Sequence, residues 1–411
     1  MKISTTNSTD KIKFPRALKF AAAVLATPLL ALILMRGSVS AQSASAAPPA
    51  KSQSAAAPAA SHVDLSKTPT LYVVNYAHLD TEWRWEYPQT IQEYLTKTMR
   101  NNFALFEKYP HYVFNFTGAN RYMFMKEYDP QDYAELKKYV AAGRWFPAGS
   151  SMEENDVNSP SAESIMRQVL YGNEYFRHEF GKASSEYMLP DCFGFPASLP
   201  SILAHAGIKG FSTQKLSSGW QPAPRVGGPD SPEHTPEGIP FNVGIWEGPD
   251  GRTILAALNP GSYTSTVNSD LTKNNPQPAG NRGEYTWNWP DRIDYNGKVT
   301  GVFTDYHYIG TGDIGGSPPE SSVKMLEAMA TKSVAVIPPV RAGGRGAVQP
   351  VAGPPEKVGD GPLKVVETRA DQMFLDIRPD QTSKMPRYKG DLELINHSAG
   401  SITSQTEHKR W

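Results

Sequence analysis

The chain has 411 residues, 39% of them hydrophobic, and its 41 basic and 41 acidic side chains cancel to a formal net charge of zero. This balance excludes binding to nucleic acid or to an anionic membrane surface through a large net positive charge. The length allows one large domain or two ordinary ones. Because Cys192 is the single cysteine, intrachain disulfides and cysteine-based zinc cages are excluded as well.

The first 41 residues have the layout of a secretory signal peptide. Basic residues up to Lys19 precede an uncharged apolar run, Phe20 to Met35, and Val39-Ser40-Ala41 is a small-x-small cleavage pattern. A membrane anchor is the alternative, although this run is short for a span. Residues 42–66, rich in alanine, serine and proline, indicate a flexible linker. We therefore expect a periplasmic or secreted protein without a stable membrane span after cleavage.

Strand-like and helical patterns alternate through residues 67–340, which we expect to form one domain. In chain order, the patterns are a buried strand over 70–77, a helix over 89–109, a strand over 112–116, a helix over 132–142, a strand over 144–148 and a helix over 161–180. This alternation indicates an α/β barrel or a doubly wound sheet. Residues 341–363 are rich in glycine and proline and predict a long flexible excursion.

His78 and Asp80 come directly after the first predicted strand. In an extended segment residues i and i+2 project to the same face, so these two side chains converge at the end of the strand. An imidazole and a carboxylate together suit a divalent metal such as zinc, and an ion pair or a catalytic dyad has the same pattern. Trp83 is close enough to serve as a platform for a sugar ring, with a place in the core as the alternative.

Two further acidic segments follow. Glu153-Glu154-Asn155-Asp156 precedes the 161–180 helix and either contacts substrate hydroxyls or caps that helix, and we expect capping for Asp156. Asp191 lies between the strand-like run 186–189 and a Pro/Gly turn that leads into a short helix over 197–207. Turns at the carboxyl ends of strands are where α/β folds place active sites, and a helix cap is the alternative role.

Taken together, these motifs resemble glycoside hydrolase family 38, the retaining zinc-dependent α-mannosidases, in their N-terminal catalytic domain. The matching segments, in the family's order, are 77–83, 154–167, 189–203, 211–216, 246–251, 310–318 and 390–404. The resemblance covers about residues 70–411. It implies a seven-stranded (β/α) barrel-like domain of the glycoside hydrolase and deacetylase type, with 364–411 as its end and the start of a helical segment.

The resemblance also implies roles for individual residues. His78 and Asp80 match zinc ligands, Asp191 matches the residue that is both zinc ligand and nucleophile, and Asp313 matches the region of the general acid. The implied reaction is hydrolysis of terminal α-mannosidic bonds in mannose-containing oligosaccharides, with retention through a glycosyl-aspartate intermediate. Asp313 would need a raised pKa to stay protonated before the first step.

Substrate contacts are expected from three further side chains, Trp83, Arg167 and Tyr308. Trp83 would stack against an apolar face of the sugar. For Arg167 and Tyr308, structural roles are the alternative.

The chain departs from the family at three places, and the Gly/Pro-rich stretch 341–363 is one of them. Tyr76 stands where many members have the first histidine of a His-x-His-x-Asp motif, so we expect altered hydrogen bonding around the metal. The sequence stops at Trp411, before the segment that carries the family's fourth zinc ligand, and neither His397 nor His408 lies in the matching motif. We therefore expect a truncated catalytic domain.

Two other functions stay open from the sequence. A truncated, catalytically impaired carbohydrate-binding fragment is consistent with the missing ligand. A metal-dependent polysaccharide deacetylase would need a His-x-x-x-His pair, and the nine histidines include none with that spacing.

Overall fold

The computed structural model describes residues 63–217, 241–274, 288–338 and 353–393. The predicted signal peptide, most of the predicted linker, His397 and His408 lie outside these residues. Leu65, which the prediction placed in the linker, is fully buried in a hydrophobic core. Within the described ranges, no helix is both long enough and apolar enough to cross a membrane.

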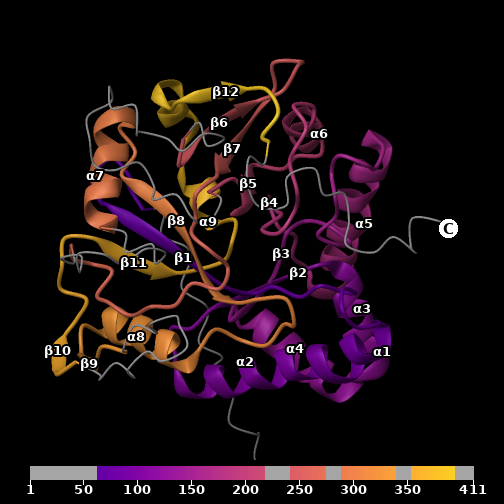
Figure 1. Cartoon of the computed structure of the whole chain (residues 1–411), viewed down its shortest axis with the longest axis horizontal. Helices are drawn as coiled ribbons and strands as arrows, with labels where there is room; N and C mark the ends of the chain where they lie inside the picture. The colour runs from indigo at the N-terminus through magenta and orange to yellow at the C-terminus, as the bar shows by residue number, and fades with distance from the viewer. Residues whose placement is uncertain (1–62, 218–240, 275–287, 339–352, 394–411) are drawn as a thin grey trace, which may run out of the picture. The chain divides into compact units, whose positions relative to one another are not determined.

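The strand β1 (Thr70–Ala77) is the centre of the first sheet, and all eight of its residues are buried. It pairs along its full length with β8 (Thr304–Thr311), near its start with β11 (Lys364–Glu367), and near its end with β2 (Phe114–Thr117). β3 (Trp145–Ala148) continues the sheet beyond β2, and every one of these pairings is parallel (Figure 1). Parallel pairing places the carboxyl ends of neighbouring strands at one edge of the sheet.

A second sheet has the order β12–β6–β7–β5–β4. Its strands are β4 (Glu186–Met188), β5 (Gly210–Ser212), β6 (Val243–Glu247), β7 (Thr253–Ala257) and β12 (Arg387–Lys389). The β6–β7 pairing is antiparallel and the others are parallel. The fold is therefore α/β with mostly parallel strands, as predicted. The pairings of the described residues form two five-stranded sheets, so the seven-stranded barrel stays a prediction.

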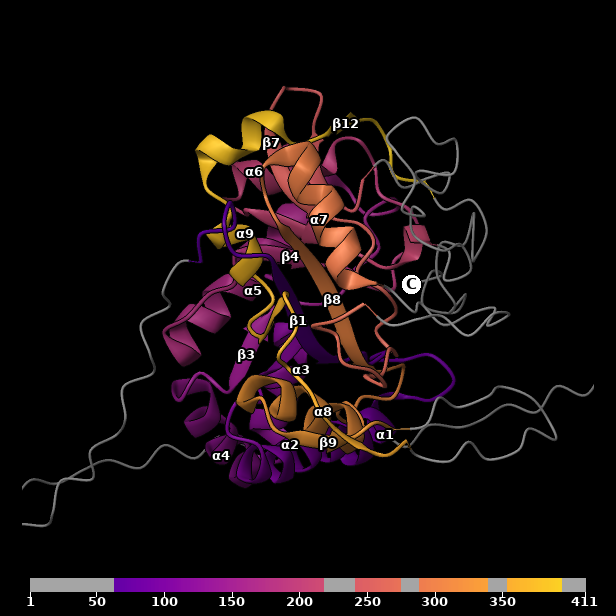
Figure 2. The same cartoon turned by 90° about the vertical axis from the view of Figure 1, so that its left-hand side faces the viewer.

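Nine α-helices and three other helical segments occur in the described residues. The α-helices are α1 (Tyr87–Gln89), α2 (Thr96–Lys108), α3 (Ala119–Tyr128), α4 (Pro130–Ala141), α5 (Ala162–Phe180), α6 (Leu199–His205), α7 (Trp289–Thr300), α8 (Glu320–Thr331) and α9 (Gln372–Asp376). A π-helical segment, Thr90–Leu95, joins α1 to α2, and 3-10 segments lie at Lys215–Ser217 and Pro379–Lys384. A short antiparallel pair, β9 (Val334–Val336) and β10 (Pro355–Lys357), lies beside α8 (Figure 2).

Alternate residues of β1 enter two different hydrophobic cores, as the two-residue period of a strand requires. Tyr72, Val74 and Tyr76 pack in a core with residues of the second sheet, including Met188 of β4. Leu71 and Val73 pack instead in a core that contains residues of α7 and α8. Tyr76 therefore lies on the side of β1 that faces the second sheet.

Several local predictions are confirmed and others need correction. Helix 161–180 is present as α5, but its cap is Ser161, whose side chain accepts a hydrogen bond from the Ser164 amide. The capping role predicted for Asp156 is wrong, because its carboxylate accepts from the Asn158 amide at 2.8 Å. The predicted excursion over 341–363 contains β10 and the fully buried Val358 in its described part, 353–363.

Candidate active site

Backbone hydrogen bonds join the segment after β1 to the segment after β8. The His78 amide donates to the Thr311 carbonyl at 2.9 Å, the Asp80 amide donates to the Asp313 carbonyl at 2.9 Å, and the Gly315 amide donates to the His78 carbonyl at 2.9 Å. Asp313 has a φ of 69°, in the left-handed region that few residues other than glycine adopt. This ladder fixes Asp313 beside His78, although the two are far apart in the sequence.

Three side chains converge where these segments meet the turn after β4. His78, Asp191 and Asp313 each offer one atom able to bind a metal, and these three atoms lie within 4.8 Å of one another. His78 Nε2 lies 3.4 Å from Asp80 Oδ1 and 3.6 Å from Asp191 Oδ2. The structure thus brings together the four residues predicted as metal ligands and catalytic groups.

Asp191 lies among positive charges. Its carboxylate forms an ion pair with Lys215, whose ammonium also lies 5.1 Å from the ring centre of Phe193. Burial opposes ionisation of Asp191, but His78 and Lys215 outweigh it and lower the pKa of this carboxyl to about 2. An ionised, largely buried carboxylate at the end of a strand has the charge that a nucleophile needs.

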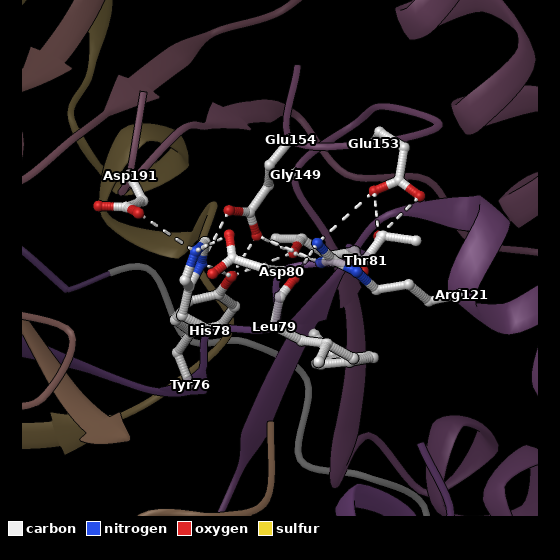
Figure 3. A network of polar contacts seen from close by, with 12 residues as sticks. Tyr76, His78, Leu79, Asp80, Thr81, Arg121, Gly149, Glu153, Glu154 and Asp191 are labelled. Atoms are coloured by element: carbon white, nitrogen blue, oxygen red, sulfur yellow. Dashed lines mark hydrogen bonds and ion pairs between the residues drawn. The ribbon is translucent and has the colours of Figure 1, made fainter. Parts of the chain in front are cut away.

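A second buried network lies on the other side of His78. Glu154 Oε2 lies 3.0 Å from His78 Nδ1, and Tyr76 and Thr117 both donate hydrogen bonds to Glu154 Oε1 (Figure 3). Arg121, on α3, lies 3.4 Å from Glu154 Oε1. Burial opposes ionisation here too, but His78 and Arg121 outweigh it and lower the pKa of Glu154 to about 2.

His78 itself is surrounded by acceptors. Burial disfavours its positive charge, but Tyr76, Glu154, Asp191 and Asp80 together raise its pKa well above the ordinary value. The two ring nitrogens therefore have different surroundings, with Tyr76 and Glu154 at Nδ1 and Asp80 and Asp191 at Nε2.

Tyr263 joins the site without any signal in the sequence. Its hydroxyl donates to Asp313 Oδ1 at 2.9 Å, and its ring centre lies 4.7 Å from that of His78. Lys215 lies in the matching segment 211–216 and Glu154 in the acidic segment 153–156, but the sequence does not reveal what either side chain contacts. Arg121 lies on α3, a helix that was not predicted at all.

The three predicted substrate contacts have different surroundings. Trp83 is half-buried, with the Arg84 guanidinium 4.1 Å from its ring centre and Trp85 at 6.1 Å. Arg167 is exposed on α5, where it pairs with Glu163 at 2.7 Å rather than with the cluster. Tyr308 is fully buried and its hydroxyl donates to Ser212 at 2.7 Å, so the structure does not support a direct substrate contact.

The cluster fits a zinc ion. Within the described residues, the buried His78 Nε2 makes no hydrogen bond, although carboxylate oxygens of Asp80 and Asp191 lie 3.4 and 3.6 Å away, so it is free to bind a metal where the carboxylates converge. Imidazole nitrogen and carboxylate oxygen are ligands that zinc accepts in proteins. His78, Asp191 and Asp313, with Asp80 beside them, could supply these ligands. The identity of the metal stays a prediction.

Comparison with known proteins gives one family. The family model for the N-terminal domain of glycosyl hydrolases family 38 matches residues 68–338. Alpha-mannosidase G of Dictyostelium discoideum is 29% identical over 342 residues, which is 83% of this chain and 26% of that protein. Human Alpha-mannosidase 2C1 is 32% identical over 192 residues, 47% of this chain and 17% of that protein.

A solved structure has the same fold. The structure of an alpha-mannosidase from Enterococcus faecalis V583 superposes with a TM-score of 0.55 at 17% identity, covering 79% of this chain and 31% of that chain. The matches therefore cover only about a sixth to a third of the length of these proteins.

Proposed function

Because the chain belongs to glycosyl hydrolases family 38 through its N-terminal domain, we propose that it hydrolyses terminal α-mannosidic bonds in mannose-containing oligosaccharides. The observation that carries this proposal is the convergence of Asp191 and Asp313 on His78, with their ligand atoms within 4.8 Å. The named α-mannosidases of the family are several times longer, so the activity of this chain is a matter for experiment.

The geometry supports a retaining reaction. Retaining glycosidases hold two carboxyl groups about 5–5.5 Å apart, whereas inverting ones leave about 6.5–9.5 Å for a water molecule. One oxygen of Asp191 and one of Asp313 lie within 4.8 Å, which favours the retaining arrangement.

Asp191 and Asp313 divide the chemistry between them. Asp191 attacks the anomeric carbon while Asp313 gives its proton to the leaving oxygen, and the glycosidic bond breaks. Asp313 then accepts a proton from the water that releases the sugar from Asp191. Lys215 keeps Asp191 ionised, and the Tyr263 hydroxyl orients Asp313.

His78, Asp80 and Asp191 would hold zinc, with Asp313 within reach of the same point. Zinc would act as a Lewis acid and as a template for neighbouring sugar hydroxyls. Trp83, directly after this motif, would stack on the sugar face. We also propose, from the signal-like N-terminus alone, that the protein is periplasmic or secreted.

The proposal is tested with purified chain, zinc and an aryl α-mannoside. Asp191→Asn should lower kcat/KM by roughly a thousandfold or more, because it removes the nucleophile. Asp250→Asn, an exposed carboxylate that pairs with His205, is the control and should stay within about twofold of wild type. Undiminished hydrolysis by Asp191→Asn would overturn the proposal.

A further inference from the structure

We propose that Tyr76 and Glu154 are positioning residues that act as a unit, fixing the proton of His78 on Nδ1 and leaving Nε2 to bind the metal. This inference rests on the metal site of the proposed function. It goes beyond the ligands themselves, because neither residue touches the point where Nε2 and the carboxylates converge in any contact that the structure records.

The hydroxyl of Tyr76 has a single proton, and it donates this proton in a hydrogen bond to Glu154 Oε1. The Tyr76 oxygen, 3.1 Å from His78 Nδ1, can then meet that nitrogen only as an acceptor. Glu154 Oε2 lies 3.0 Å from the same nitrogen as an ion-pair partner; no hydrogen bond is recorded at this oxygen within the described residues, but its negative charge also favours a proton on Nδ1. Because both neighbours of Nδ1 are acceptors, Nδ1 must carry a proton.

This assignment requires Glu154 to be a carboxylate, and its surroundings provide for that. Arg121 is 2% exposed and lies 3.4 Å from Glu154 Oε1, and an arginine stays protonated inside a protein. Arg121 is held in turn by the Leu79 carbonyl at 2.5 Å and by the Thr117 hydroxyl at 2.8 Å. The Thr117 hydroxyl donates a hydrogen bond to Glu154 Oε1. Tyr76, Thr117 and Arg121 thus all place donor groups at Glu154 Oε1; Figure 3 shows Tyr76 and Arg121 beside this carboxylate.

A proton on Nδ1 also determines the state of Nε2, on the opposite side of the His78 ring. With Nδ1 protonated, the lone pair that a metal needs can be only on Nε2, the buried nitrogen beside Asp80 and Asp191. A carboxylate behind a ligating histidine also makes that histidine a better ligand, and its loss typically weakens metal binding about 10–100-fold. Here the hydroxyl of Tyr76 shares this role with the carboxylate, because the two are joined by a hydrogen bond.

Zinc affinity of the full chain, measured by competition with a chelating dye, tests the inference. Glu154→Gln should weaken zinc binding roughly 10–100-fold, because it removes the negative charge behind Nδ1 and turns an NH2 donor toward either Nδ1 or the donors that surround Oε1. Tyr76→Phe should weaken binding less, by several-fold, since Glu154 remains next to Nδ1. Glu154→Asp should recover part of the affinity that Glu154→Gln loses.

Asp305→Asn is the matched control. Asp305 is a buried carboxylate paired with an arginine, Arg292, and it lies in none of the contacts of the site. Its replacement should lower thermal stability but leave zinc affinity within about twofold. A second readout is the Nδ1 proton of His78, which should appear as a solvent-protected resonance in the zinc-loaded, ¹⁵N-histidine-labelled chain and be lost in Glu154→Gln.

Zinc affinity within twofold of wild type in both Glu154→Gln and Tyr76→Phe would overturn the inference, as would a wild-type chain that binds no zinc. If Glu154→Gln does not fold, Tyr76→Phe decides alone. These measurements need no substrate, so their failure is distinguishable from failure of the proposed hydrolysis, which the aryl mannoside assay reports separately.

Discussion

The two ends of β4 carry carboxylates in opposite electrostatic surroundings. Asp191, just after the strand, has Lys215 and His78 beside it, and its pKa is lowered to about 2. Glu186, the first residue of the strand, is fully buried, and burial together with the nearby Asp371 raises its pKa. The same short strand is thus followed by a carboxyl group that ionises easily, Asp191, and begins with one that tends to keep its proton, Glu186.

The difference lies in the partners rather than in burial. At the site, cations lie beside two of the acidic groups, with Lys215 at Asp191 and Arg121 at Glu154. At the start of β4, Glu186 is met by the Gly149 amide at 2.8 Å and by the Ser184 hydroxyl, and both are neutral. A buried carboxyl group stays ionised where a cation lies beside it, and tends to keep its proton where its partners are neutral.

Removing Arg121, the cation beside Glu154, should have the largest effect on stability. Arg121→Met leaves Glu154 buried without its positive partner, and breaking a buried pair in this way costs about 3–5 kcal/mol. Urea unfolding at neutral pH measures the loss. Arg177→Met, an exposed arginine that pairs with Glu174 at 3.6 Å, should change the free energy of unfolding by less than about 0.5 kcal/mol. A loss below about 1 kcal/mol in Arg121→Met would contradict this account of the balance.

The pair at the start of β4 should be coupled. The Asp371 carboxylate accepts from the Ser185 amide at 3.1 Å and pairs with Arg369 at 2.6 Å, and it raises the pKa of Glu186. In a double-mutant cycle, Glu186→Gln and Asp371→Asn should show an interaction energy of about 0.5–3 kcal/mol. Urea unfolding of wild type, the two single variants and the double variant measures this energy. Additive effects would show that the two carboxyl groups do not interact.

Glu186 should also make stability depend on pH. Its folded pKa is raised above the ordinary 4.5, so above that value the unfolded chain loses a proton that the folded chain keeps. Stability from this group is therefore complete below about pH 4.5 and decreases as the pH rises through the folded pKa. Thermal unfolding at pH 5 and pH 8 should show a smaller decrease in Tm for Glu186→Gln than for wild type.

Glu135→Gln, an exposed glutamate that pairs with Lys138, is the control and should keep the wild-type pH dependence. An identical decrease in Tm for wild type and Glu186→Gln would mean that Glu186 ionises normally in the folded chain.

The sequence predicted the parts of the site that belong to local motifs. His78, Asp80 and Asp191 follow predicted strand-like runs, and parallel pairing brings such positions together. Asp313 was assigned only through the resemblance to the family, because no strand was predicted before it. The partners that set their charge were not predictable, because they come from elements with no local signal. Arg121 lies on α3, which mixes apolar and charged residues without a clear apolar face, and Tyr263 lies outside any helix or strand.

The same limit applies to the fold. The alternation of strands and helices gave the α/β class, whereas the pairing of β1 with β8 and β11 depends on contacts between distant segments. Tyr308 is an example: the sequence left a substrate contact and a structural role both open, and the structure places this tyrosine in the core.

The central claim is that the carboxylate after β4 is the nucleophile. An activated fluorinated mannoside that traps the glycosyl-enzyme, followed by peptide mapping with mass spectrometry, tests it most directly. The account predicts one sugar per chain, on the peptide that contains Asp191, and no label in Asp191→Asn. A label on Asp313 or elsewhere, or turnover of the substrate without any covalent label, would contradict it.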